Sequence, residues 1–122
     1  MYEVRASPGK NRLYFTMAGV VSADDARAAA ERVEEEMKRL RPGFDTVSNI
    51  AGLEPLPPEA LEQIRRINRY LVGFQRGRIL RVVGRSAKTA VQFERLSKAH
   101  GYSAQLAFSL QEAERLLDAK IE

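Results

Sequence analysis

Few residues in this chain have the types and spacing that chemistry requires. The sequence holds one histidine, His100, and no cysteine. His100 stands just before Gly101 at an expected helix end, where the helix dipole favours a protonated imidazole. A catalytic histidine needs an orienting acid and a nucleophile, and no sequence signature supplies them, so we interpret His100 as structural and expect no enzymatic activity. Without thiolates, and without ligand spacing among the Asp and Glu residues, the sequence predicts no metal site and no cofactor.

A second group of candidates combines cations with the expected start of a helix. Ser86 suits the N-cap position, and Arg85 and Lys88 lie on either side of it. Free N–H groups at a helix start, beside two cations, can hold an anion such as phosphate or carboxylate. An N-cap with two surface cations explains the same residues, and no Gly-rich phosphate loop of recognised spacing accompanies them. We therefore keep a small anionic ligand as an alternative and favour the simpler explanation.

The elements that position these residues are organised around the stretch 44–61. Its first part has the length and apolar content of a buried strand and ends before Pro55. Pro55, Pro57 and Pro58 are incompatible with a regular strand or a helix interior, and Pro58 suits the first turn of a helix. Apolar residues at spacings of three and four then predict a long amphipathic helix that ends near Gly77. The residues of this stripe are Leu61, Ile64, Ile67, Leu71 and Phe74.

The rest of the chain alternates strand and helix patterns in the order β-β-α-β-α-β-α-β-α. We expect strands near 2–6, 13–21, 44–53, 79–83 and 104–108, and helices near 23–40, 58–77, 86–97 and 110–117. Strands separated by helices favour parallel pairing with right-handed crossovers. The sequence therefore predicts one α/β domain over residues 1–122, with a mixed, mostly parallel sheet of about five strands, an N-terminal antiparallel hairpin and four flanking helices. Because the second strand is apolar on both faces, we expect both of its faces to be covered.

Composition narrows the classes of function. Hydrophobic residues make up 44% of the 122 residues and charged residues 30%, which is typical of a soluble globular domain. No apolar run is long enough to span a membrane, and the first ten residues lack the apolar core of a signal peptide. Together with the absence of cysteine, these features favour a cytoplasmic location.

The net charge of +4 is unevenly distributed. Residues 59–100 carry ten Lys or Arg against three Glu, whereas residues 23–47 carry five against seven Asp or Glu. A basic middle could attract nucleic acid, anionic lipid or an acidic protein face. Nucleic acid binding is not expected, because Tyr70 is the only ring beside the arginines that the helix stripe leaves exposed. A solvated, arginine-rich helix face is the favoured explanation.

Four stretches carry a resemblance to a known family: VSNIAGLEPLPPEALEQI, GRILRVVG, QFERL and AHGYSAQLAFSLQEAERLL. With the element order, they make nearly the whole chain resemble the STAS fold of anti-sigma-factor antagonists, in particular its SpoIIAA-like, STAS/SEC14-type branch. In the classical family, an anti-sigma kinase phosphorylates a serine at the start of the helix after the third strand, and its charge controls docking. The matching positions here, Pro57, Pro58 and Glu59, carry no hydroxyl. Glu59 supplies part of the charge of a phosphoserine, but a favourable position at the helix N-terminus is the preferred explanation.

The resemblance implies a non-catalytic regulatory or scaffolding module that binds a protein partner. Its expected contact surface comprises Glu54, Pro57, Pro58, Glu59, Arg65, Arg66, Arg69, Arg85, Ser86 and Lys88. The SEC14-type resemblance leaves an alternative, a carrier that holds a small amphipathic or lipid-like ligand between helix and sheet. Self-association as a homodimer stays open.

Overall fold

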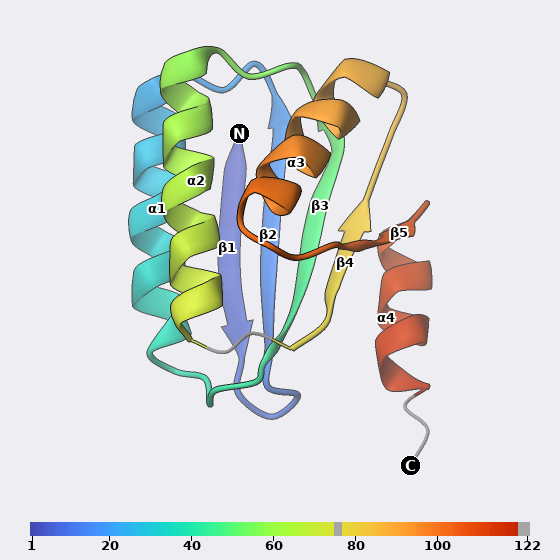
Figure 1. Ribbon diagram of the computed structural model, residues 1–122. Coiled ribbons are helices and arrows are strands. Elements are labelled where there is room, and N and C mark those ends of the chain that lie inside the picture. Colours follow the sequence, from blue (N-terminus) through green and yellow to red (C-terminus); the bar gives the residue numbers. More distant parts are fainter. Residues whose placement is uncertain (75–76, 120–122) are drawn as a thin grey trace.

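The computed structural model describes residues 1–74 and 77–119, and its elements follow the predicted order (Figure 1). The strands are β1 (Tyr2–Ser7), β2 (Arg12–Gly19), β3 (Asp45–Leu53), β4 (Ile79–Val82) and β5 (Gln105–Ala107). The helices are α1 (Ala23–Met37), α2 (Pro58–Gly73), α3 (Ala87–Ala99) and α4 (Leu110–Asp118). The strands lie in the sheet in the order β1-β2-β3-β4-β5, with β1 antiparallel to β2 and the other pairs parallel. The predicted mixed sheet with an N-terminal hairpin is therefore confirmed.

The strand order explains where the helices lie. Each parallel strand from β2 to β5 is added on the same side of the one before it, so right-handed crossovers place α1, α2 and α3 on one face of the sheet. Figure 1 shows α1 and α2 side by side, with α3 next to them and α4 standing apart. The helix α4 follows the last strand and covers part of the opposite face.

The larger core lies between α1, α2, α3 and the sheet. Phe44 and Met17 are fully enclosed in it, and burying a side chain of this size contributes about 1.5–3 kcal/mol. Three alanines of α1 with no exposed surface allow that helix to approach the sheet closely: Ala26, Ala29 and Ala30. The predicted stripe of α2 is confirmed, because Ile64, Ile67 and Leu71 are all buried.

Three helix starts have the side-chain caps that the sequence indicates. Ser22, Ser86 and Ser109 each accept a hydrogen bond from the backbone N–H three residues later. At the end of α3, Gly101 has φ of +77°, a conformation that glycine adopts without strain. His100 lies at this end, where its Nδ1 donates to the Leu96 carbonyl oxygen at 2.9 Å. These contacts set the ends of the helices that flank the candidate site.

The end of α2 differs from the prediction. The helix ends at Gly73, four residues before the expected end near Gly77, and residues 75–76 of the expected last turn lie outside the described part. Gly77 already donates its N–H to the Phe44 carbonyl oxygen at 2.7 Å, alongside β3. The chain must therefore leave the helix early enough to reach the sheet edge.

The burial of side chains on two strands also differs from the expectation. On β2, Tyr14 is buried under α4, but Thr16 and Ala18 are half-exposed, because a nine-residue helix is too short to cover the whole second face. On β5, Leu106 and the following Phe108 are exposed, and Ala107 is the buried residue. The second face of the sheet is thus only partly covered.

Candidate functional site

The predicted contact residues outside the middle of α2 lie at the carboxyl edge of the parallel strands, where ligands gather in open α/β sheets. Glu54, Pro57, Pro58 and Glu59 are exposed in the loop after β3 and in the first turn of α2. Pro57 is the N-cap of α2 and makes no side-chain capping bond, so Glu59 is the group that complements the positive end of this helix.

A pair of hydrogen bonds fixes this loop against α3. Gln92 Nε2 donates to the Leu56 carbonyl oxygen at 2.9 Å, and the Leu56 N–H donates to Gln92 Oε1 at 2.9 Å. Thr89 Oγ1 donates to the Leu53 carbonyl oxygen at 3.0 Å. The proline-rich loop is therefore held in one place relative to α2 and α3.

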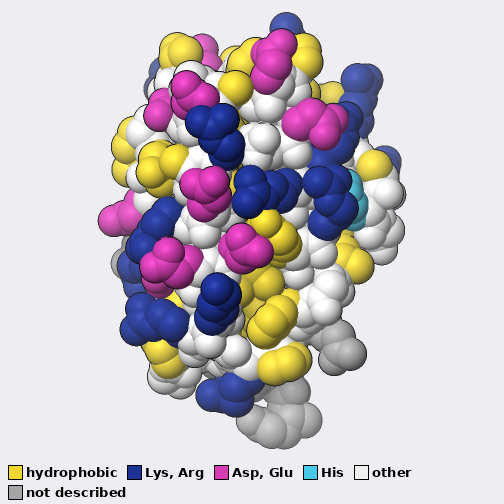
Figure 2. All heavy atoms as spheres, turned by 90° about the vertical axis from the view of Figure 1, so that its left-hand side faces the viewer, with side chains coloured by type: hydrophobic (Ala, Val, Ile, Leu, Met, Phe, Trp, Pro, Cys, Tyr) yellow, Lys and Arg dark blue, Asp and Glu magenta, His cyan; other side chains and the backbone are white. Residues whose placement is uncertain are grey.

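The three predicted arginines of α2 do not form one surface. Arg66 donates from Nε to the Tyr70 hydroxyl oxygen at 2.7 Å and lies 3.9 Å from the Glu34 carboxylate of α1. The hydrogen bond to Tyr70 and nearby α1 carboxylates raise the pKa of Arg66, despite a small opposing effect of burial. Arg69 lines a hollow between α1 and α2. Figure 2 shows basic and acidic side chains interspersed on this side of the molecule, so the acidic face of α1 offsets much of the positive charge of α2.

Arg65 faces the other way and lines a groove between α2 and α3, hereafter the α2–α3 groove, with a volume of about 370 Å³. Lys88 and Arg95 of α3 line the same groove. Its apolar part comes from Leu61, Val91 and Leu96. Arg65 has an ion pair with Glu62 at 2.6 Å, whereas no ion pair joins Lys88 or Arg95 to any residue that the structure describes. The groove therefore joins two predicted residues, Arg65 and Lys88, to Arg95, which the sequence analysis missed.

The structure gives Ser86 and Arg85 less support as an anion site than the sequence suggests, because Ser86 already caps the helix. The Ser86 hydroxyl oxygen accepts from the Thr89 N–H at 3.1 Å and from Thr89 Oγ1 at 2.8 Å, so Ser86 already satisfies one of the free N–H groups at this helix start. Arg85 is exposed, and the described residues offer it no ion pair. The arrangement is that of a capped helix with surface cations.

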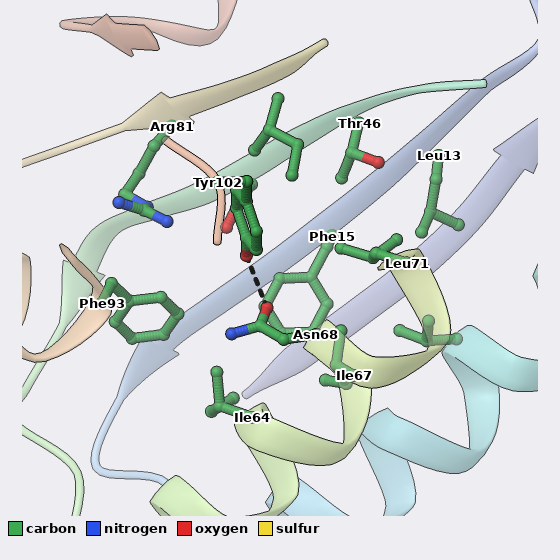
Figure 3. Close-up of a pocket in the computed structure, with 13 residues that line it drawn as sticks. Leu13, Phe15, Thr46, Ile64, Ile67, Asn68, Leu71, Arg81, Phe93 and Tyr102 are labelled. Atoms are coloured by element: carbon green, nitrogen blue, oxygen red, sulfur yellow. Dashed lines mark hydrogen bonds between the residues drawn. The ribbon is translucent and has the colours of Figure 1, made fainter. Parts of the chain in front are cut away.

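A small cavity of about 30 Å³ lies between α2, α3 and the sheet (Figure 3). This volume corresponds to roughly one or two water molecules. Most of its lining is apolar, but five polar residues contribute: Thr46, Ser48, Asn68, Arg81 and Tyr102. The Tyr102 hydroxyl donates to Asn68 Oδ1 at 2.6 Å, whereas Thr46 Oγ1 and Arg81 Nε have no hydrogen-bond partner in the described part of the chain.

On the opposite face of the sheet, a network of charges attaches α4. Arg12 contacts Glu114 at 3.1 Å and Asp118 at 2.8 Å, and the Tyr14 hydroxyl donates to Glu114 at 2.7 Å. Lys10 contacts the other Glu114 oxygen at 3.2 Å. Burial raises the pKa of Glu114, but the hydrogen bonds from Tyr14 and Lys10 and the adjacent cations outweigh it and lower that pKa below its ordinary value. Every member of this network has a partner, so its role is structural.

One of the buried arginines, Arg81, has a sequence signal that could have identified it. Arg81 is a charged residue inside the apolar run ILRVV, where a solvated arginine is unexpected. Gln92 and Arg95 offer no such signal, because they occupy ordinary positions on a helix surface.

Within the described residues, no group of three or more His, Cys, Asp or Glu side chains is placed to hold a metal ion. No helix in the same residues is long and apolar enough to cross a membrane. The chain matches no protein-family model and no curated protein.

Proposed function

We propose that this chain is a non-catalytic module that binds a protein partner, and that an acidic, amphipathic segment of the partner occupies the α2–α3 groove. The observation that carries the proposal is the lining of that groove. Three cations, Arg65, Lys88 and Arg95, line it together with apolar side chains, and its lining contains no carboxylate from the described residues. A helix with apolar residues on one face and Asp or Glu at its margins complements such a groove.

The position of the groove supports the same conclusion. It adjoins the proline-rich loop that Gln92 and Thr89 hold against α3, so the surface is preorganised before the partner arrives. Val91 in the groove is 48% exposed, and covering its apolar surface would add to the affinity. The resemblance to anti-sigma-factor antagonists favours the same class of function, and membership in that family remains part of this proposal.

Charge reversal distinguishes this groove from the α1–α2 side of the molecule. The test variant carries Arg65→Glu, Lys88→Glu and Arg95→Glu. The control carries Arg27→Glu, Lys38→Glu and Arg69→Glu, which changes the net charge equally but lies on α1 and on the α1 side of α2. Quantitative affinity purification from the native host should enrich the same protein with the original chain and with the control, and lose it with the test variant.

The captured protein is then purified and titrated against all three chains by calorimetry. Loss of binding should be at least about tenfold for the test variant, because several cations at one groove are removed together. Equal binding by the test and control variants would refute docking in the α2–α3 groove. Failure to enrich any protein above an inert bait would count against the partner-binding function itself.

The alternative, a carrier for a small amphipathic or lipid-like ligand, would use the small cavity beside Tyr102. At about 30 Å³ this cavity has no room for an acyl chain unless α2 and α3 separate. Native mass spectrometry of freshly purified protein tests the alternative directly. A bound lipid-sized mass would favour the carrier, and a bare polypeptide mass would leave partner binding as the better supported function.

A further inference from the structure

Arg81 is buried, and no ion pair joins it to any residue that the structure describes. The residue lies in β4 and is 4% exposed, and its guanidinium lies near Phe93 and Tyr102 (Figure 3). Its Nη2 donates to Ser97 Oγ at 2.6 Å, and Phe93 lies 5.7 Å from its central carbon. Neither Nε nor Nη1 has a hydrogen-bond acceptor among the described residues. Part of the donor fork of the guanidinium is therefore unused.

Such an arrangement is costly to the fold. A buried charge is ordinarily paired and hydrogen-bonded, because removal from water is repaid only by good contacts inside the protein. Burial lowers the pKa of Arg81 below its ordinary value, and the charges of Tyr102 and Glu94 offset this effect only in part. A group kept at this cost is a candidate for a binding role.

Arg81 can be reached from the surface. It lines a second cavity of about 70 Å³ beside the end of α3, hereafter the Ser103 cavity, together with Ser97, Lys98, Tyr102 and Ser103. Arg81 also lines a wider groove between α3 and β5, where Arg95 and Lys98 add positive charge. The lining of this groove thus contains three cations, Arg81, Arg95 and Lys98, and one carboxylate, Glu94, among the described residues.

We propose that Arg81 is the receptor for a small oxyanion, a carboxylate or phosphate group, which enters through the Ser103 cavity. The planar fork of a guanidinium matches the oxygens of either group. The cavity has the size of a small ion or of the charged end of a larger molecule. The proposed oxyanion site is distinct from the α2–α3 groove, because Arg81 does not line that groove, although Arg95 lines both that groove and the wider one.

Glu94 is the one carboxylate in the lining of the Ser103 cavity and is therefore the competing anion. Its carboxylate pairs with Lys98 at 3.4 Å on the same helix, and no ion pair within 4.0 Å joins it to Arg81. Glu94 thus reduces the positive charge of the cavity without satisfying Arg81. Replacement of Glu94 therefore distinguishes binding of an external anion from pairing of Arg81 with Glu94.

Titration of the full chain with sodium phosphate and, separately, sodium acetate tests the proposal, with sodium chloride at matched ionic strength as the reference. The Nε–H signal of Arg81 is followed by NMR on nitrogen-15-labelled protein, together with the melting temperature. One of the two anions should give a saturable shift of that signal, and its identity distinguishes phosphate from carboxylate recognition. Absence of saturation with both anions would overturn the proposal, whatever the variants do.

Two variants locate the effect. Arg81→Met keeps the volume and removes the charge, and it should weaken anion binding by roughly tenfold or more, as expected for a lost charged hydrogen bond. Unchanged binding in this variant would place the anion elsewhere and overturn the proposal. Glu94→Gln should bind the anion as tightly or more tightly, because the competing carboxylate is gone. Binding that appears only in Glu94→Gln would identify Glu94 as the true partner of Arg81 and exclude the external ligand.

Discussion

Arg12 and Arg81 are equally buried on opposite faces of the same sheet, each 4% exposed, but their surroundings differ. Arg12 forms ion pairs with two carboxylates of α4, Glu114 and Asp118. Arg81 faces α3, where its one side-chain acceptor is the hydroxyl of Ser97. The guanidinium of Arg12 attaches a helix to the sheet through two ion pairs, whereas the guanidinium of Arg81 has no ion pair with any described residue.

The pKa values differ in the same way. Burial lowers the pKa of Arg12, but hydrogen bonds to Asp118 and Tyr14 and the nearby carboxylates raise it above its ordinary value overall. Burial lowers the pKa of Arg81, and no comparable partner opposes it. The Nε of each arginine lacks a hydrogen-bond partner among the described residues, but two carboxylates neutralise the charge of Arg12. A buried arginine that is paired with carboxylates is explained by the fold, whereas one without such an ion pair calls for an explanation outside the fold. The comparison therefore separates a structural site from a candidate binding site.

Removal of Arg12 should have the largest effect on stability. Arg12→Met leaves Glu114, which is only 26% exposed, with Lys10 as its remaining cation, removes the ion pair to Asp118, and so weakens the attachment of α4 to the second face of the sheet. We expect a loss of about 2–3 kcal/mol in the free energy of unfolding, below the cost for a fully buried pair because both carboxylates reach solvent. Urea unfolding measures it, with Arg27→Met at an exposed ion pair as the control. A loss below about 0.5 kcal/mol would mean that Arg12 does not hold α4.

Acid should abolish the advantage that Arg12 confers. The hydrogen bond from Arg12 lowers the pKa of Asp118, and Tyr14 and the adjacent cations lower that of Glu114 despite its burial. Carboxylates with lowered pKa values stabilise the folded state above their unfolded pKa of about 4 and lose that contribution as the pH falls through the folded values. The gap in urea midpoint between the original chain and Arg12→Met should therefore shrink between about pH 6 and pH 3. A gap that stays constant would show that the pairs contribute nothing to stability.

The sequence predicts the helices and strands of this fold better than the side-chain contacts between them. Local signals such as the serine N-caps and the apolar stripe of α2 act within a few residues, and the structure confirms them. Arg12 and Glu114 are 102 positions apart in the sequence, and the hydrogen-bonded residues Leu56 and Gln92 are 36 positions apart. No local pattern encodes such contacts, because they depend on the helix positions that the strand order determines. The exposed face of β2 was missed for the same reason, since the length of α4 decides what that face touches.

On the Arg81 side, loss of the single acceptor should have a moderate effect. Ser97→Ala removes the hydroxyl that accepts from Arg81, and leaves the guanidinium without a side-chain acceptor in the described part. We expect a loss of about 1–2 kcal/mol, in the range for a hydrogen bond to a charged group. Ser103→Ala is the control, because Ser103 is exposed and lines the same cavity. An equal effect of the two serine changes would show that the Ser97 bond is unimportant.

Removal of Arg81 itself should have the smallest effect, which makes the comparison with Arg12 sharpest. Arg81→Met takes away a buried charge that forms no ion pair with a described carboxylate, and it fills the space with an apolar side chain. Replacement of a buried charge by a well-packed apolar residue is often neutral or stabilising, so we expect a change within about 1 kcal/mol, in the direction of greater stability. Urea unfolding in chloride buffer, with Arg12→Met measured alongside, gives the contrast.

If Arg81→Met destabilised the chain as much as Arg12→Met does, Arg81 would be a structural residue with an internal partner, and the case for an external oxyanion would lose its basis. If instead the variant is as stable as the original chain in chloride but gains no stability from the anion that shifts the Arg81 signal, then the cost of burying Arg81 is offset by binding and not by folding.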